Sequence, residues 1–371
     1  MVGKGVSVTL VSALTSNVLL DARVARLVGV SRNYAVADAM EELNYRSFDE
    51  GARRNWEAQI VSSLTMPVAE DEQIDVVDLF SGCGGLSLGF ELAGFNVVAG
   101  IDSWEYAVES YSKNFNHDCY RQDLSEMAST VELIKSKLRR EKRFGIIGGP
   151  PCQDFSLAGK REEKSRAEMT MQFARFVQIF QPEFFLMENV PNALKSGIYR
   201  EALEELEKDY AVITEVLEAF DHGVPQRRKR LFAFGCKDAE ISNRVRQNLK
   251  YGLELQTFTL EEWFGSNGID SAYYRHPRSY QRRGIFSAKE PSPTIRGVNR
   301  PVPPTYKKHH GDVADPKMVR ALSSEQRAQI QTFPSGFCFT GPQSAIEQMV
   351  GNAVPVRLAN FVAKAILDEI A

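Results

Sequence analysis

The chain has 371 residues, of which 43% are hydrophobic and 25% charged, and its formal net charge is −3. These proportions are ordinary for a soluble globular enzyme and argue against disorder, and the length predicts one large or two ordinary domains. No apolar run of about 18 residues occurs and Val6–Leu20 lacks a convincing cleavage site, so neither a membrane span nor a secretory signal is expected. The five cysteines form no CxxC pair, which disfavours a disulfide framework or a metal site and fits a reducing cytoplasm.

Residues 1–72 are expected to form a helical extension. Asp21–Leu43 predicts two helices, in which Ala25, Gly29, Val30 and Ser31 have the spacing of a helix-turn-helix. Asp38 then falls where an apolar residue would be expected, so plain helical packing is the favoured alternative. Pro67 and the acidic residues 70–72 mark the boundary before the next domain.

From residue 74 the pattern changes to strands alternating with helices. Strands are predicted at 74–80, 95–101, 144–147 and 183–187, and helices at 85–93, 104–115 and 169–180. This alternation predicts an α/β domain over residues 73–236, with a mostly parallel, Rossmann-like sheet covered by helices on both faces. In such a sheet ligands bind at the carboxyl ends of the strands.

The first of these strands ends in a glycine loop, Ser81-Gly82-Cys83-Gly84-Gly85. Glycines between a strand and a helix allow a ligand to approach the backbone closely. Asp102, at the end of the next strand, is placed to accept hydrogen bonds from both hydroxyls of a ribose. Taken alone, the loop also fits NAD or FAD, but its spacing is GxGG and no pyrophosphate cradle is evident. Asp123 could bind an adenine amino group or cap the helix ahead of Glu126.

A thiol and a carboxyl group follow two further strands. Pro150 and Pro151 fix the loop that holds Cys152, for which a buried structural thiol is the alternative to a nucleophile. Its setting at a strand end beside glycines favours the nucleophile. Glu188 follows an apolar run, so burial should raise its pKa and allow it to donate a proton near neutrality, whereas helix capping by Asn189 is the alternative for that segment.

Basic side chains are concentrated in two places. Gln226, Arg228 and Arg230 alternate along a predicted strand and therefore share one face, where two guanidiniums need an anion, a phosphate or Glu188. Residues 271–310 hold nine Lys or Arg against the single acid Glu290, a local charge of +8, with aromatic residues between them. This pattern indicates contact with phosphates, the alternative being a solvated loop.

The alternation of strands with helices stops after residue 237. Residues 237–340 are predicted to form a smaller, loop-rich domain, with regular structure returning at 323–333 and a last helix at 357–370.

In this order, the motifs resemble those of the DNA cytosine-5 methyltransferase family over roughly Ile74–Ile370. Asp78–Gly85 resembles the S-adenosylmethionine loop of the family, Pro151–Gln153 its nucleophile motif, Glu188–Val190 its acid motif and Gln226–Arg230 its arginine motif. Gly351–Pro355 resembles the closing motif, so residues 341–371 are expected to return to the first domain. Pro293–Gly297 resembles the target-recognition segment.

The resemblance implies roles for individual residues. Catalytic roles are implied for Cys152, Glu188 and Arg228, with Arg228 positioning Glu188 and the base. Contacts with S-adenosylmethionine are implied for Asp78, Phe80, Ser81, Gly82, Gly84, Gly85, Asp102, Asp123, Leu124, Pro150, Asn352 and Val354. Contacts with DNA are implied for Gln153, Ser156, Arg230, Thr294, Ile295, Arg296 and Arg300.

The implied reaction rotates a cytosine out of duplex DNA, attaches Cys152 to carbon 6 and methylates carbon 5, with no metal. The family often has an aromatic residue directly after the ribose carboxylate, whereas this chain has Ser103 there and Trp104 one position later. The enzyme is expected to be a monomer of the bacterial cytoplasm, and a cognate restriction endonuclease is not visible in the sequence.

Two alternatives to this function stay open. One is a tRNA cytosine-5 methyltransferase, because Cys338-Phe339-Thr340 is similar to a tripeptide of the RNA-modifying branch, although it lies close before the closing motif. The other is DNA binding by residues 1–72, either as an additional autoregulatory activity or as the sole role of the protein.

Overall fold

The computed structural model describes residues 20–30, 35–65, 73–139, 141–151, 160–252, 256–265, 268–279 and 281–371, without the side chains of 45–50 and 160–167. The chain divides into two compact units. Unit 1 comprises Met1–Pro67, Phe258–Ser292 and Asn299–Cys338, and unit 2 comprises Val68–Thr257, Pro293–Val298 and Phe339–Ala371. No helix of the described residues is long and apolar enough to cross a membrane.

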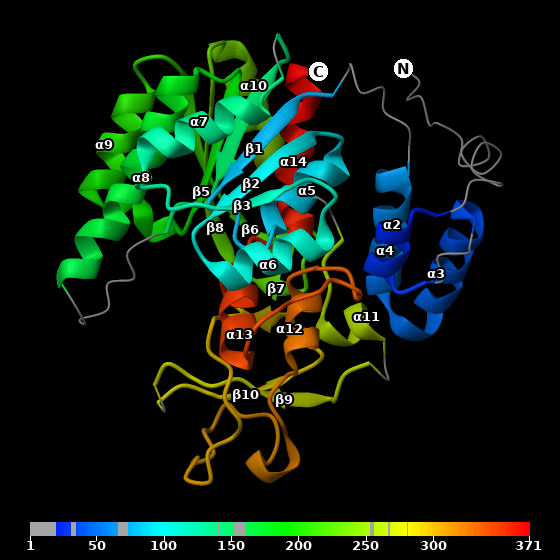
Figure 1. Ribbon diagram of the computed structural model, residues 1–371. Helices are drawn as coiled ribbons and strands as arrows, with labels where there is room; N and C mark the ends of the chain where they lie inside the picture. The colour runs from blue at the N-terminus through cyan, green and yellow to red at the C-terminus, as the bar shows by residue number, and fades with distance from the viewer. Residues whose placement is uncertain are drawn as a thin grey trace. The chain divides into compact units, whose positions relative to one another are not determined.

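Unit 2 is built on a seven-stranded sheet (Figure 1). Its strand order is β3 (Cys119–Arg121), β2 (Asn96–Asp102), β1 (Asp75–Leu79), β4 (Phe144–Gly148), β5 (Phe184–Asn189), β8 (Lys229–Cys236) and β6 (Ala211–Glu218). Strands β1 to β5 pair in parallel, and β8 runs antiparallel to both of its neighbours. The predicted mostly parallel sheet is confirmed. The chain moves outward from β1 to β3 and then returns to β4 beside β1, which creates the switch point where such sheets bind ligands.

Helices cover both faces of this sheet. On one face, α5 (Gly85–Ala93), α10 (Ala239–Tyr251) and α14 (Val356–Ile370) contribute to one apolar core. On the other face, α7 (Met127–Lys137), α8 (Lys160–Phe180) and α9 (Gly197–Leu206) contribute to a second. A Cβ atom at Gly89 of α5 would lie 2.4 Å from Cβ of Ala359 in α14, so the two helices cross at close range. Helix α14 thus packs against α5, the first helix of the α/β segment.

Shorter elements of unit 2 complete the connections. They are α6 (Glu105–Asn114), α13 (Gln343–Asn352), the 3-10 turns η1 (Pro191–Lys195) and η2 (Ala219–His222), and β7 (Gln226–Arg227). The predicted strands and helices of residues 74–187 match the observed ones closely, except that α8 begins nine residues before the predicted start at 169.

Helix α10 departs from the sequence prediction, because residues after 237 were expected to lack regular structure. Asp238 caps this helix by accepting hydrogen bonds from the backbone N–H groups of Glu240 and Ile241. Val245 and Leu249, one helical turn apart, are fully buried against the sheet. The expectation of irregular structure is therefore wrong for 239–251.

Unit 1 combines N-terminal helices with later segments of the chain. Its elements are α2 (Ala22–Val28), α3 (Val36–Glu50), α4 (Ala52–Thr65), α11 (Leu260–Phe264), β9 (Ala272–Tyr274), β10 (Ile285–Ser287), η3 (Pro316–Met318) and α12 (Ser324–Ile330). The strands β9 and β10 form an antiparallel pair. The two-residue strand β11 (Ser292–Pro293) spans the point in the sequence where the unit 1 segment ends at Ser292 and a unit 2 segment begins at Pro293.

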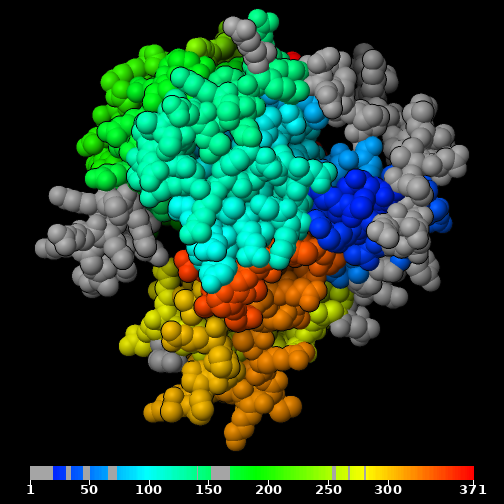
Figure 2. Space-filling model, in the orientation of Figure 1, coloured from blue at the N-terminus to red at the C-terminus, as the bar shows by residue number. Residues whose placement is uncertain are grey.

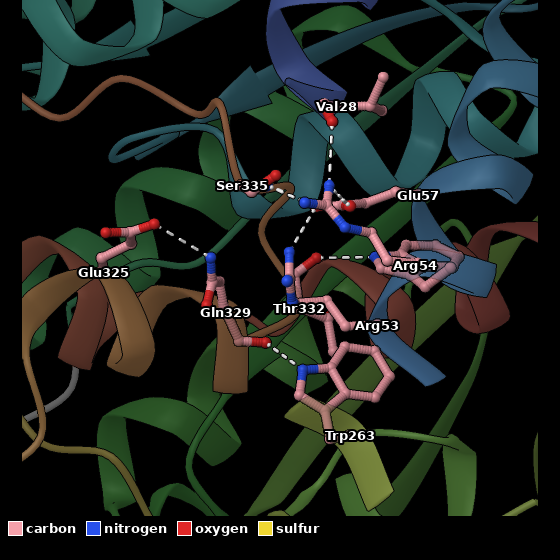
Figure 3. A network of polar contacts seen from close by, with 10 residues as sticks. Val28, Arg53, Arg54, Glu57, Trp263, Glu325, Gln329, Thr332 and Ser335 are labelled. Carbon is pink, nitrogen blue, oxygen red and sulfur yellow. Dashed lines mark hydrogen bonds and ion pairs between the residues drawn. The ribbon is translucent and has the colours of Figure 1, made fainter. Parts of the chain in front are cut away.

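A buried polar network joins α4 to the segment after α12 (Figure 3). The fully buried Glu57 carboxylate accepts hydrogen bonds from Arg54 Nη1 at 2.6 Å and from the backbone N–H of Ser335 at 2.9 Å. Trp56 Nε1 donates to the carbonyl of Thr332 at 2.9 Å. Every partner lies within unit 1, so α4 is part of the core of that unit. The domain boundaries predicted at residues 72, 236 and 340 stay predictions.

The two helices predicted within residues 21–43 are present as α2 and α3. Gly29 ends α2 with a positive φ of 69°, as the predicted turn requires, whereas Ser31 lies outside the described residues. Helix α3 contains five acidic residues and one arginine. A DNA-reading helix with this charge would be repelled by phosphates, so the composition of α3 disfavours a helix-turn-helix that binds DNA.

Candidate active site

The glycine loop after β1 combines backbone strain with an open approach. Phe80 has a φ of 59°, and Gly82 and Gly84 have φ values of 55° and 95°. A Cβ atom at Gly84 would lie 2.4 Å from Phe115 Cε2, so a side chain is excluded there. At Gly82, in contrast, no atom of the described residues lies within 4 Å of such a Cβ. Positive φ at a non-glycine residue is uncommon and gathers at ligand sites, and the open side of Gly82 leaves room for a ligand.

Asp102 is fixed beside this loop at the end of β2. Its two carboxylate oxygens accept hydrogen bonds from the backbone N–H groups of Gly82 at 2.9 Å and Trp104 at 2.8 Å. Burial raises the pKa of Asp102, and these N–H groups oppose that effect. Ser103 is exposed, whereas the half-buried Trp104 ring lies edge-on to Tyr106, with ring centroids 6.2 Å apart. Trp104 and Tyr106 are thus two aromatic side chains that follow Asp102 closely in the chain.

Asp78 lies deeper in the unit and begins a chain of polar contacts. Its Oδ2 accepts a hydrogen bond from Ser87 Oγ at 2.6 Å, and Ser87 Oγ accepts one from Tyr111 Oη at 2.7 Å. Tyr111 Oη also lies 2.7 Å from His117 Nε2. Burial raises the pKa of Asp78 to about 7. This chain was not found from the sequence, because Ser87 and Tyr111 lie in helices and carry no motif of their own.

The other residues expected near the cofactor differ in exposure. Asp123 is exposed and accepts a hydrogen bond from the backbone N–H of Ser125 at 2.9 Å, which is a contact within the turn before α7 and not an N-cap of that helix, whose N-cap residue is Glu126. Leu124, Pro150 and Val354 are buried, and Asn352 is exposed. Ser81 Oγ lies 3.8 Å from Cys119 Sγ, and Gly85 begins α5.

Glu188, the last but one residue of β5, forms an ion pair in a nearly dry position. Its Oε1 lies 2.7 Å from Arg230 Nε, and its carboxylate is about nine-tenths buried. Burial raises the pKa of Glu188, while the charges of Arg230 and Arg228 oppose that increase. A Cβ atom at Gly149 would lie 3.0 Å from Glu188 Oε2, so the glycine makes room for the carboxylate. The backbone carbonyl of Pro150 accepts a hydrogen bond from Asn189 Nδ2 at 3.2 Å.

Arg228 makes different contacts from those expected, because Arg230 is the residue paired with Glu188. The fully buried Arg228 guanidinium donates hydrogen bonds to the carbonyls of Ile295 and Gly351, each at 2.9 Å, and of Ala353 at 3.0 Å. Burial lowers its pKa, and the nearby charge of Arg230 adds to that effect. Arg228 therefore links residues 293–298 to residues 351–353, and its charge also acts on Glu188.

The segment 293–298 is held by two further contacts from the arginine motif. The backbone N–H of Ile295 donates to Gln226 Oε1 at 2.8 Å, and Thr294 Oγ1 donates to the carbonyl of Arg227 at 2.8 Å. A Cβ atom at Gly351 would lie 2.1 Å from the backbone nitrogen of Gly297, so the closing motif crosses this segment backbone to backbone. Gln226, Arg228 and Arg230 are buried, and Arg227 and Lys229 are exposed, which confirms the predicted alternation.

The structure does not bring all predicted site residues together. Cys152, Gln153 and Ser156 lie outside the described residues, which end before them at Pro151. Arg296 is half-buried in unit 2, and Arg300 is an exposed residue of unit 1. Among the described residues, no group of three or more His, Cys, Asp or Glu side chains could hold a metal ion. Gly149 was missed as a site residue, although its place directly before the two prolines was a usable signal.

Comparison with known proteins gives concordant matches. The profile of the family described as C-5 cytosine-specific DNA methylase matches residues 74–368. The type II methyltransferase M.HgiDI of Herpetosiphon aurantiacus is 47% identical over 289 residues, covering 77% of this chain and 92% of the relative. The type II methyltransferase M.HindV of Haemophilus influenzae is 46% identical over 299 residues, which cover 79% of this chain and 96% of the relative.

A solved structure matches at the level of the fold. The methyltransferase EhMeth of Entamoeba histolytica superposes with a TM-score of 0.60 at 19% identity, covering 81% of this chain and 99% of that chain.

Proposed function

We propose a mechanism from the premise that the chain belongs to the C-5 cytosine-specific DNA methylase family. It is a DNA cytosine-5 methyltransferase. The finer proposal is that S-adenosylmethionine is the methyl donor, that Cys152 is the nucleophile and that Glu188 acts on the ring of an extruded cytosine. The observation that carries it is the buried Glu188–Arg230 pair, which lies beside Gly149. The neighbouring Asn189 donates a hydrogen bond to the carbonyl of Pro150, two residues before Cys152 in the chain.

The residues at the switch point fit S-adenosylmethionine. The open side of Gly82 suits close approach of an adenosine group, and Asp102 has further lone pairs for ribose hydroxyls beyond the two hydrogen bonds that it accepts. Trp104 offers an aromatic face to the adenine. The bound cofactor would supply an electrophilic methyl group on a sulfonium.

Cys152 and Glu188 are assigned complementary steps. The Cys152 thiolate adds to carbon 6 of the cytosine, and the electron pair of the carbon 5–carbon 6 double bond moves toward carbon 5. Glu188, whose pKa is raised by burial, donates a proton or hydrogen bond to ring N3 and so stabilises the charge that develops. After carbon 5 has been methylated, loss of its proton expels the Cys152 thiolate and restores the double bond.

Arg230 and Arg228 are assigned positioning roles. Arg230 holds the Glu188 carboxylate at 2.7 Å and limits the increase of its pKa, so that the group can both hold and release a proton. Arg228, with Gln226, orders Thr294 and Ile295, for which the family resemblance implies a role near the extruded base. Arg296 and Arg300 stay candidates for contacts with DNA, together with Gln153 and Ser156.

The relatives suggest the biological setting. Two of them are named type II methyltransferases, and this chain covers more than nine-tenths of each. We therefore propose that the enzyme acts on a short duplex sequence in the bacterial cytoplasm as the modification member of a restriction-modification pair. A monomer is sufficient for this chemistry, and a cognate endonuclease would be a separate chain.

The experiment that tests this mechanism uses the Cys152→Ala and Glu188→Gln variants with tritiated S-adenosylmethionine and duplex DNA. Cys152→Ala is expected to lose transfer to the background level, because carbon 5 is not activated without the thiol. Glu188→Gln can still donate a hydrogen bond to N3 but cannot ionise. It should therefore retain reduced activity and lose the fall in rate that the wild type shows as rising pH deprotonates Glu188.

A duplex bearing 5-fluorocytosine provides the control for the covalent step. The fluorine prevents the final elimination, so the wild type should give a stable protein–DNA adduct on the peptide that contains residue 152. Near-normal turnover by Cys152→Ala would exclude the mechanism. Transfer to tRNA in preference to duplex DNA would instead contradict the substrate.

A further inference from the structure

A buried carboxylate in unit 1 gathers hydrogen-bond donors from two separate segments. Asp312 Oδ1 accepts hydrogen bonds from the backbone N–H groups of Gly284 and Ile285, each at 2.9 Å. Its Oδ2 accepts from Tyr306 Oη and from the backbone N–H of His309, each at 2.8 Å. Gly284 and Ile285 lie where the hairpin enters β10, whereas Tyr306 and His309 belong to the loop that precedes Asp312.

Aromatic contacts reinforce this junction. The Tyr306 ring packs edge-on against Tyr274 of β9, with ring centroids 5.4 Å apart, and Tyr306 Oη accepts a hydrogen bond from the Gly284 N–H at 2.9 Å. A Cβ atom at Gly284 would lie 2.7 Å from Tyr306 Oη, so only glycine fits there. The hydrogen bonds lower the pKa of Asp312 against the opposing effect of burial. The carboxylate therefore stays ionised and holds both segments.

The segments joined in this way carry exposed cations. Arg278 and Arg282 lie at the exposed tip between β9 and β10, and Lys307 and Lys308 are exposed in the loop directly after Tyr306. In the space-filling view, the gold and orange residues after position 300 project from the bottom of unit 1 (Figure 2). Asp312 itself is only 8% exposed, so its negative charge is shielded while the four cations face solvent.

We propose that Asp312 is a positioning residue for DNA binding, which fixes the 303–311 loop against the β9–β10 hairpin so that their cations contact the phosphates of one duplex. The inference rests on the proposed function only in taking duplex DNA as the partner. Phosphate contacts fix the register and orientation of a protein on DNA. A loop held by four hydrogen bonds makes them with less ordering cost than a free loop.

Asp312→Asn is expected to weaken DNA binding, whereas its matched control Asp315→Asn is expected to leave binding unchanged or to strengthen it. Each substitution removes one negative charge, so charge alone predicts tighter DNA binding by both variants. In Asp312→Asn, the new amide would keep one acceptor oxygen and turn an N–H group toward the N–H of His309 or of Gly284, which breaks the junction. Asp315 is exposed and caps η3 through the Lys317 N–H, a role that Asn fills equally well.

The probe is a fluorescein-labelled duplex of random sequence, because phosphate contacts do not depend on sequence. Fluorescence anisotropy should show a Kd that is on the order of tenfold higher for Asp312→Asn and unchanged or lower for Asp315→Asn. Tighter binding by both variants would overturn the proposal. KM for DNA should rise in Asp312→Asn, while kcat at saturating DNA and the affinity for S-adenosylmethionine stay at the wild-type values.

A second variant covers the case in which Asp312→Asn does not fold. Lys307→Gln/Lys308→Gln changes only exposed side chains and should reduce the slope of log Kd against log salt by roughly 1.8, which corresponds to two lost phosphate contacts. An unchanged slope would exclude the loop from the DNA interface. These binding measurements need no methyl transfer, so a failure of the proposed chemistry would appear separately, as an absence of turnover in the wild type.

Discussion

Asp78 illustrates, at the scale of one residue, how a buried carboxyl group affects the stability of unit 2. One of its oxygens accepts a hydrogen bond from Ser87, and the other has no hydrogen-bond partner among the described residues. Burial raises its pKa from the usual 3.8 to about 7. The unfolded chain therefore releases this proton at a lower pH than the folded chain does, and the stabilisation present below pH 3.8 is lost as pH rises through about 7.

Asp78→Asn should remove this dependence, because the amide does not ionise. The variant is expected to gain stability relative to the wild type as pH rises between about 4 and 7, by at most about 4 kcal/mol. Thermal unfolding at a series of pH values measures the difference in Tm. Parallel pH profiles of the two proteins would show that Asp78 is already ionised in the folded state.

The residues around Glu188 show what the sequence can and cannot predict about the site. Period-2 alternation placed Gln226, Arg228 and Arg230 on one buried face, as observed. It did not say which arginine meets Glu188, because that depends on strand register. Glu188 lies opposite Phe232 in the β5–β8 pair, so Arg230, two residues before Phe232, is its diagonal neighbour on the same face. Register of this kind follows from tertiary packing and is not encoded in the local pattern.

At the scale of elements, prediction succeeded where periodicity and end signals agreed. The strands β1, β2, β4 and β5 are rich in apolar residues and were located closely, whereas the three-residue β3 was not predicted. Helix α10 was missed because its polar face dominates the sequence and its buried face rests on a few residues, among them Val245 and Leu249. Its capping residue, Asp238, was a usable signal.

The crossing of α5 and α14 leads to a prediction at this scale. Gly89→Ala would place a methyl group 2.4 Å from Ala359 Cβ, so the helices must move apart, and a loss of about 1–3 kcal/mol in the free energy of unfolding is expected. Gly197→Ala, at the start of α9, is the matched control, because in the part of the chain that the structure describes no atom lies within 4 Å of the added carbon. The control should be neutral or more stable by up to about 1 kcal/mol. Denaturant unfolding followed by circular dichroism compares the two, and equal midpoints would contradict the close crossing.

At the scale of the whole molecule, the charge distribution matters more than the net charge. The chain carries −3 overall, yet residues 271–310 carry nine cations against one acid. Most of this stretch belongs to unit 1, which also contains α4 and its buried Glu57. The sequence did not predict that residues 1–67 and 299–338 belong to the same unit. Their association depends on contacts such as that of Glu57 with the Ser335 N–H, which composition does not reveal.

The concentrated positive charge predicts strongly salt-dependent DNA binding in spite of the negative net charge. If at least five of the nine cations contact phosphates, log Kd should change with log salt with a slope of magnitude roughly 4 or more. Anisotropy titrations of random duplex over a range of KCl concentrations measure this slope. A flat dependence would mean that the basic stretch does not face DNA.

The short segment Pro293–Val298 belongs to unit 2, although the chain on either side of it belongs to unit 1. Gln226 and Arg228 hold it through backbone groups, and Gly351 crosses it without a side chain. Such anchoring is indifferent to what the flanking loops contain. Side chains exposed in those loops can therefore drift in evolution without loosening the anchor.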